Sequence, residues 1–339
     1  MTIPARLRSA LVPLVVLLVV LAGGFVPATE QRLVTEMLVF GLFAMSLNIL
    51  LGYTGLPSLG HGLYFGASAY ATALIVREWT ENLAVVLIAG PLLAALVAAV
   101  VGLVALRTTG AYFLMITFAF AQLGVAFTTQ SGDLTGGADG LTGIFRPDLG
   151  IEGIELYDAR WFYFFVAVIV LVGMALLAQL MRSPFGATLT GIRENPERMQ
   201  ALGFNVWAHR YAAFVVSGAF AGLAGVLVAY LNGFVSPELL GLTTSAEVLL
   251  MVVLGGAGTM FGPLVGAVVV LGLEELSKSV GDGDHYRLLL GLAYVVTVLI
   301  ARKGIVRALR TLVPAHRRSR QPEQPVTGAR RPSEREKVA

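Results

Sequence analysis

The stretch "LAVVLIAGPLLAALVAAVVGLVAL", residues 83–106, contains no charged side chain. A helix needs about 20 mostly apolar residues to cross a hydrocarbon core of about 30 Å. Similar apolar runs recur from one end of the 339-residue chain to the other. Strands of a membrane barrel would instead appear as alternating segments of about 10 residues. The sequence therefore predicts an all-α protein, a polytopic transmembrane helical bundle.

The composition points to the same class. Hydrophobic residues make up 56% of the chain and charged residues 13%, whereas about 25% of the residues of a soluble domain are charged. The chain has no cysteine, which excludes disulfides, thiol chemistry and cysteine-ligated metals. Its four histidines are not spaced as metal ligands, so no metal site is predicted.

Apolar runs bounded by charged or turn residues predict about eight full spans and one broken region. The first run follows Arg6 and Arg8, is long for a signal peptide and lacks a good cleavage site, so we expect it to stay as a helix. A transmembrane domain would then cover 10–301, between an N-terminal segment 1–9 and a basic tail 302–339. The predicted full spans are 10–28, 33–51, 58–76, 83–106, 111–129, 161–181, 210–231 and 286–301; the broken region is 245–276.

The broken region contains "GGAGTMFGP", residues 255–263, with glycines and a proline inside an apolar run. Irregular backbone at membrane depth is tolerated where protein covers it, so two helices could turn back here. The alternative is one long kinked span, which would place the C-terminal tail on the opposite side. Small residues also mark expected helix contacts, namely Gly218, Gly222, Gly225, Gly262 and Gly266.

Basic residues set the expected orientation, because they concentrate on the cytoplasmic side of membrane proteins. With both termini in the cytoplasm, the loop 182–210 is cytoplasmic and the acidic, glycine-rich loop 130–160 lies outside, where it is expected to form tight turns. The tail is rich in arginine, proline and glutamate and has few apolar residues, so it is expected to be disordered. It is either solvated or in contact with anionic membrane lipid.

The loop stretch "GIRENPERMQALGFN", residues 191–205, is unusually charged for this chain. Asn195 can cap a helix and Pro196 suits its first position. Gly203 can end the helix, which predicts about two turns over Pro196–Leu202. So short a helix is not stable alone in water. It either connects two spans while lying on the protein or the bilayer, or it docks on a cytoplasmic partner.

Several stretches resemble bacterial ABC-importer permeases for branched-chain amino acids, and most closely their LivM-type subunits. They are "GYTGLPSLGHGLYFGASAYATALIV" (52–76), "TGGADGLTGI" (135–144), "SPFGATLTGIRENPERMQALGFNVWAHRYAAFVVSGAFAGLAG" (183–225) and "VLLMVVLGGAGTMFGPLVGA" (248–267). The resemblance implies a multi-pass protein of the bacterial inner membrane. It also implies two ABC ATPase subunits, a homologous second permease subunit and an extracytoplasmic solute-binding protein as partners.

In that family the loop helix is the coupling helix, which sits in a cleft of the ATPase. Pro196 departs from the uninterrupted acidic and apolar run that the family often has, but proline fits the start of a helix. Carried over to this chain, the residues implied for the ATPase contact are Arg193, Glu194, Asn195, Pro196, Glu197, Arg198, Ala201, Leu202 and Gly203.

The chain has no G-x-x-x-x-G-K-[ST] motif, so we expect no ATPase activity and no cofactor of its own, with ATP bound by the partner subunits. The resemblance implies branched-chain or other hydrophobic amino acids as substrate, while urea and short amides stay open. Two further classes also stay open, an ion-coupled secondary transporter and a non-transporting membrane scaffold. Ion-coupled carriers usually hold an ionisable residue in mid-membrane, where only His61 is a candidate here. No nucleic-acid partner is expected.

The stretch "GYTGLPSLGHG", residues 52–62, breaks helical periodicity with glycine, proline and serine. Transporters build substrate and gate sites from such broken segments at membrane depth. This places the predicted translocation path beside the break and on the fifth span. Its candidate residues are Ser58, His61, Tyr64, Tyr112, Thr117 and Gln122.

Overall fold

The computed structural model describes residues 23–147, 155–280, 288, 290–292 and 294–295. The N-terminal segment, most of the first predicted span and the C-terminal tail lie outside these residues, as does most of the last predicted span. The described part of the chain is built mainly of helices, with one short pair of strands.

The first half of the chain forms α2 (Ala28–Asn48), the π-helix η1 (Ile49–Thr54), α3 (His61–Glu78), α4 (Leu83–Ala105), α5 (Ala111–Gln130), α6 (Gly132–Thr135) and strand β1 (Leu141–Thr142). The second half forms α7 (Ala159–Arg182), α8 (Pro184–Glu194), α9 (Pro196–Ala201), α10 (Val206–Asn232), strand β2 (Phe234–Val235), the 3-10 helix η2 (Pro237–Leu240), α11 (Leu242–Gly255) and α12 (Gly262–Val280).

Five of the described helices are long and apolar enough to cross a membrane, namely the helix over Glu30–Thr54, α4, α5, α7 and α10. The first and last of these form the centre of the bundle, with 78% and 67% of their most apolar stretches buried. The other three are 22–33% buried, so they present wide apolar faces to their surroundings. The fold is thus a helical membrane bundle, although the expected count of eight spans is not confirmed.

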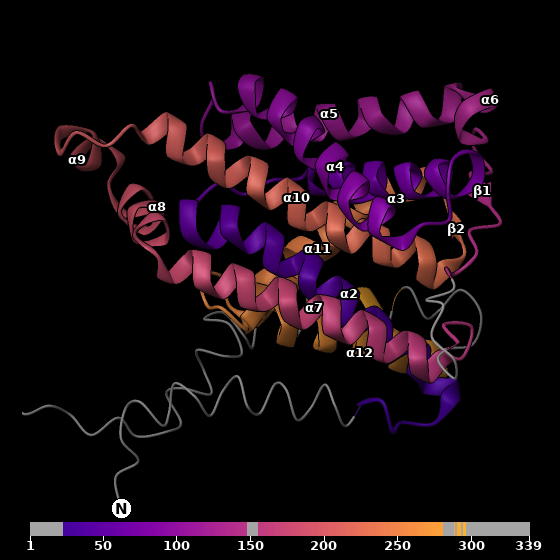
Figure 1. Ribbon diagram of the computed structural model, residues 1–339. Coiled ribbons are helices and arrows are strands. Elements are labelled where there is room, and N and C mark those ends of the chain that lie inside the picture. The colour runs from indigo at the N-terminus through magenta and orange to yellow at the C-terminus, as the bar shows by residue number, and fades with distance from the viewer. Residues whose placement is uncertain (1–22, 148–154, 281–287, 289, 293, 296–339) are drawn as a thin grey trace, which may run out of the picture.

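The long helices run between two ends of the bundle (Figure 1). One end carries α9, and we call it the α9 end. The other carries α6, β1 and β2, and we call it the β end. The strands pair antiparallel, with Leu141 opposite Val235. The loop 130–160 therefore contains a helical turn and a strand in addition to the expected tight turns, and it is fastened to the end of α10.

The predicted break at 52–62 is present, but its position differs from the predicted span. The second span continues through η1 to Thr54, and Gly55 then adopts the left-handed conformation with a φ of 74°. The chain runs irregularly to Gly60, so α3 begins at His61 and not at residue 58. Pro57 disfavours helical backbone in the residue before it, and Gly60, with a φ of −106° and a ψ of 13°, stands before the helix as its N-cap.

The predicted break in 245–276 is also present, as a hairpin of α11 and α12. Gly256 and Gly258 have φ values of 113° and 79°, which only glycine adopts readily. A Cβ on Gly266 would clash with the carbonyl of Met251, and one on Gly255 with the carbonyl of Gly262. The two helices therefore run antiparallel with their backbones in close contact.

Glycines on α10 mark its contacts with two neighbouring helices. A Cβ on Gly218 would clash with the methyl group of Ala98, and one on Gly222 with that of Ala94, both on α4. A Cβ on Gly225 would clash with a backbone carbonyl of α3. Small residues on both sides let α10 approach α3 and α4 closely, as they do in other membrane bundles.

Candidate functional site

The loop between α7 and α10 contains two helices where the sequence analysis predicted one. Ser183 accepts a hydrogen bond from the backbone N–H of Phe185 at 3.2 Å, and Pro184 occupies the first helical position of α8. Arg193 and Glu194, predicted as part of the docking helix, instead lie in the last turn of α8. Ser183 and Pro184 are the same cap-and-proline pattern that revealed the second helix.

The second helix, α9, follows the prediction closely. The Asn195 side chain accepts a hydrogen bond from the backbone N–H of Arg198 at 2.8 Å, with Pro196 at the first position. The helix ends at Ala201, one residue before the predicted end, and Gly203 is left-handed with a φ of 87°. The following span starts at Val206 and not at residue 210, because Asn205 caps it.

No residue of α9 is buried, and the helix lies at the far end of the bundle (Figure 1). Apolar side chains beside it are exposed as well. Leu202 is 65% exposed, Phe204 40% and Trp207 43%. Glu197 and Arg198 add charge to the same short segment. This combination of apolar and charged groups on a capped helix suits contact with another protein better than contact with water alone.

In contrast, α8 is packed onto the bundle. Leu189 and Ile192 are fully buried, and the helix contacts η1. A Cβ on Gly191 would lie 2.8 Å from the sulfur of Met199, so the two loop helices touch at this point. Through α8, the exposed helix α9 is attached to the broken end of the second span.

Arg193 makes the closest polar link between the loop and the bundle. Its guanidinium donates a hydrogen bond to the carbonyl of Gly52, in η1. Its aliphatic stem lies beside Gly55, where a Cβ would be 3.1 Å from the Arg193 Cγ. The same guanidinium lies close to Gly258, in the turn between α11 and α12.

Asn48 joins the same place from the other side. Its side-chain N–H donates to the carbonyl of Thr259 at 2.9 Å, and its side-chain oxygen accepts from the N–H of Gly258 at 2.9 Å. The two broken segments of the bundle, residues 49–60 and 256–261, therefore meet beside Asn48 and Arg193. We call this meeting point the junction.

Four of the residues predicted for the path lie around the start of α3. His61 is fully buried and its Nε2 lies 2.8 Å from the Ser46 Oγ. Thr117 accepts from the N–H of Leu59 at 3.3 Å, and Ser58 accepts from the N–H of Gly60 at 3.2 Å. Tyr64 is also fully buried, and its ring meets that of His61 edge-on.

The other two residues predicted for the path lie elsewhere. Tyr112 is 73% exposed, and Gln122 is exposed too, on the outer face of α5. The structure therefore brings together Ser58, His61, Tyr64 and Thr117 but not the whole predicted set.

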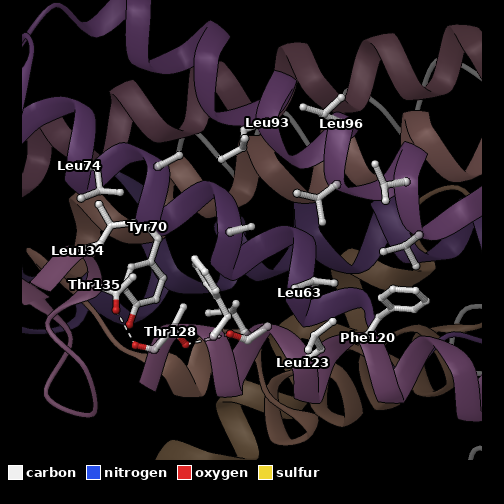
Figure 2. Close-up of a pocket in the computed structure, with 18 residues that line it drawn as sticks. Leu63, Tyr70, Leu74, Leu93, Leu96, Phe120, Leu123, Thr128, Leu134 and Thr135 are labelled. Atoms are coloured by element: carbon white, nitrogen blue, oxygen red, sulfur yellow. Dashed lines mark hydrogen bonds between the residues drawn. The ribbon is translucent and has the colours of Figure 1, made fainter. Parts of the chain in front are cut away.

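A cavity of about 630 Å³ lies between α3, α4 and α5, and none of the predicted path residues lines it. Leu93, Leu96, Phe120 and Leu123 form much of its wall (Figure 2). Tyr70, Thr128 and Thr135 gather at one end of it, and Thr135 donates to the backbone carbonyl of Thr128.

This cavity suits a hydrocarbon chain and not a free amino acid. None of the residues that line it is charged. The ammonium and carboxylate groups of an amino acid would therefore be buried there without partners, which is costly. We do not assign the transported solute to it.

Sequence reasoning missed Asn48, which bonds the turn between α11 and α12. A signal was present, because Asn48 is a polar amide inside the apolar stretch "FAMSLNILLGY", residues 43–53. Polar side chains in membrane helices often bond across helices. Its partners lie more than 200 residues away, so the sequence alone did not indicate which backbone groups it would meet.

Comparison with known proteins gives consistent matches. The family model described as "Branched-chain amino acid transport system / permease component" matches residues 31–301. The chain is 29% identical over 290 residues to the high-affinity branched-chain amino acid transport system permease protein LivM of Escherichia coli (strain K12), covering 79% of this chain and 67% of that protein.

Two archaeal proteins are also similar. The chain is 25% identical over 279 residues to the probable branched-chain amino acid transport permease protein LivM of Methanocaldococcus jannaschii, covering 70% of this chain and 80% of that protein. The probable permease protein LivH of the same organism is 29% identical over 149 residues, covering 42% of this chain and 46% of that protein. No solved structure matches the chain at a significant level.

Proposed function

The chain belongs to the branched-chain amino acid transport permease family, and on that premise we propose that it is the permease subunit of an ABC importer. It forms part of the translocation pathway for branched-chain or other hydrophobic amino acids. ATP hydrolysis in two partner subunits drives transport, and a solute-binding protein delivers the substrate. A second, homologous permease completes the pathway, in line with the similarity to both LivM and LivH proteins.

The observation that carries the proposal is the exposed, capped helix α9. A helix of six residues without a buried side chain gains little from packing inside its own chain, where Met199 touches α8 at Gly191. Such a short helix is marginal in water, yet Asn195, Pro196 and Gly203 preserve it. A partner that covers α9 and the exposed Leu202 would supply the missing contacts. We therefore assign α9 as the element that docks on the ATPase subunit.

The orientation follows from the same assignment. The ATPase is cytoplasmic, so the α9 end faces the cytoplasm and the β end faces outside. Arg182, Arg193, Arg198 and Arg210 all lie at or near the α9 end, in keeping with the preference of basic residues for the cytoplasmic side. The acidic loop at the β end then faces the binding protein, and both termini lie in the cytoplasm.

The test uses Ala201→Arg, which places a long charged side chain on α9. The residue is exposed, so the change is expected to leave the amount of protein in the membrane unaltered, within about 0.5 kcal/mol of stability. We expect weaker recovery of the ATPase subunits with the permease, and ATP hydrolysis that no longer responds to loaded binding protein. Membrane abundance, complex recovery and stimulated hydrolysis are measured on the same samples.

Ala138→Arg is the matched control, because Ala138 is also exposed but belongs to the loop at the β end. It is expected to leave ATPase recovery unchanged. Normal recovery and normal stimulation in the Ala201→Arg variant would show that α9 is a connecting helix. Uptake by the purified chain alone in liposomes, driven by a proton or sodium gradient, would instead support a secondary transporter.

A further inference from the structure

Three segments that are far apart in the sequence end at the junction. Residues 49–60 leave helical geometry through the π-helix η1 and the left-handed Gly55. The turn 256–261 reverses the chain between α11 and α12. The end of α8 brings Arg193, two residues before the cap of α9. Each segment stops being regular at the point where it meets the other two.

The bonds at the junction form a chain of contacts in a definite order. Arg193 donates a hydrogen bond to the Gly52 carbonyl. Asn48 lies one turn before Gly52 on the same helical run. The Asn48 side chain accepts from the N–H of Gly258 and donates to the carbonyl of Thr259. The Asn48 amide thus bonds a peptide N–H and a neighbouring peptide carbonyl at once. It fixes the register of the turn against η1 as well as the distance between them.

Close packing leaves little room for the segment 49–60, the turn 256–261 and the end of α8 to move independently. A Cβ on Gly52 would lie 2.5 Å from the N–H nitrogen of Gly258, closer than real Cβ atoms approach. A Cβ on Gly258 would lie 3.0 Å from the Arg193 guanidinium and 3.1 Å from the Gly52 carbonyl. Packed elements of this kind change between discrete arrangements and do not deform continuously.

We propose that Arg193 is the positioning residue that passes a displacement of α8 and α9 to both broken segments, and that Asn48 makes these segments move together. The inference rests on the proposed function, because it takes the ATPase as the source of the displacement. Arg193 then acts within the permease and not on the partner. The segment 49–60 contains Ser58 and leads directly into His61, so the displacement would reach the predicted path.

A simpler role for Arg193 predicts different behaviour. Basic side chains often bond the last carbonyls of a helix and stabilise its end. If Arg193 only caps η1, its loss would lower stability or assembly and leave the yield of transport per ATP unchanged. If it passes the displacement, its loss would lower that yield in a complex that still assembles.

The experiment uses the full complex of permease, ATPase and binding protein in proteoliposomes. Arg193→Met keeps the aliphatic stem and removes the hydrogen bond and the charge. We expect normal complex recovery, continued ATP hydrolysis and at least about a fivefold fall in solute imported per ATP, the size of a typical coupling between sites. Arg193→Lys, which keeps a donor, is expected to restore part of the yield.

Arg107→Met is the matched control, since Arg107 is exposed in the connection between α4 and α5 at the same end of the bundle. Its yield per ATP is expected to equal that of the unaltered complex. An unchanged yield for Arg193→Met would overturn the proposal. Loss of the complex with Arg193→Met but not with Arg193→Lys would overturn it too, because Arg193 would then serve assembly.

A second measurement follows the turn directly. The chain has no cysteine, so Ala257→Cys places a single thiol in the turn 256–261. Its rate of labelling by a membrane-permeant thiol reagent is expected to change at least about fivefold when ATP binds, and the change should vanish when Arg193→Met is added. The proposal would be refuted if ATP did not change the labelling rate, or if ATP still changed it in the presence of Arg193→Met. Failure of the unaltered chain to recruit an ATPase would refute the proposed function instead.

Discussion

The helices α8 and α9 begin in the same way and end in different surroundings. Each starts with a side-chain cap and a proline, Ser183–Pro184 in one and Asn195–Pro196 in the other. Yet α8 buries part of its surface against the bundle, whereas no residue of α9 is buried. The capping residues therefore determine where a helix starts, but they do not determine what the helix packs against. In this chain, one loop contains both an anchored helix and an exposed one.

The largest expected difference between the two helices is in stability. Ile192→Ala empties a fully buried site on α8 and is expected to lower the free energy of unfolding by about 2–5 kcal/mol. Leu202 directly follows α9 and is 65% exposed. Leu202→Ala is therefore expected to lower the free energy of unfolding by less than about 0.5 kcal/mol. Unfolding of both variants in detergent, followed by helical circular dichroism, measures the difference. Equal losses would mean that α9 is packed as firmly as α8.

A smaller difference is expected when the caps are removed. Ser183→Ala and Asn195→Ala each remove a side-chain cap, which typically costs about 1 kcal/mol. Because α8 is also supported by buried residues, it should keep its helical form without Ser183. The helix α9 has no such support, so Asn195→Ala should melt it and expose its backbone N–H groups.

Hydrogen exchange of the loop in the purified permease is the measurement for the cap variants. Faster exchange over 196–201 in Asn195→Ala, with no matching change over 184–194 in Ser183→Ala, is the expected pattern. The contrast between the helices breaks down if exchange over 184–194 rises as much in Ser183→Ala, because α8 would then depend on its cap as α9 does.

The smallest effect is expected where the two helices touch. Gly191→Ala adds a methyl group 2.8 Å from the sulfur of Met199. Met199 has a flexible side chain that can move aside, and alanine favours the helix by up to about 1 kcal/mol over glycine. We expect these effects nearly to cancel, leaving the melting temperature of the purified permease almost unchanged. A large loss of stability would show that α9 is held rigidly against α8.

The parts of the fold that could be predicted depend on signals carried by neighbouring residues. Asn195, Pro196 and Gly203 together indicated α9, and the glycines of 255–263 indicated the break between α11 and α12. Ser183 and Pro184 carry an equally clear signal for the start of α8. The late start of α3 at His61 is marked in the sequence by Gly60, which stands before the helix as its N-cap.

The parts that could not be predicted depend on distant partners. The Gly52 carbonyl that receives Arg193 is 141 residues earlier in the chain. Helical periodicity places Tyr112 and Thr117 on different faces of one span, but it does not indicate that the backbone of Thr117 packs against Gly60. For the same reason, the sequence placed Arg193 on the surface of the docking helix, and only the fold revealed its contact with η1.

The hairpin of α11 and α12 has a consequence for how the protein is made. The 14 residues of α11 rise about 21 Å, less than a hydrocarbon thickness of about 30 Å, so α11 is too short to cross a membrane by itself. Buried peptide groups without a hydrogen-bond partner are costly, and Asn48 bonds two such groups in the turn. Ribosomal synthesis delivers α2 about 200 residues before the turn, so the acceptor and donor are already in the bilayer when the hairpin arrives. A permuted gene that made the hairpin first would leave these two peptide groups without the Asn48 amide until α2 was made.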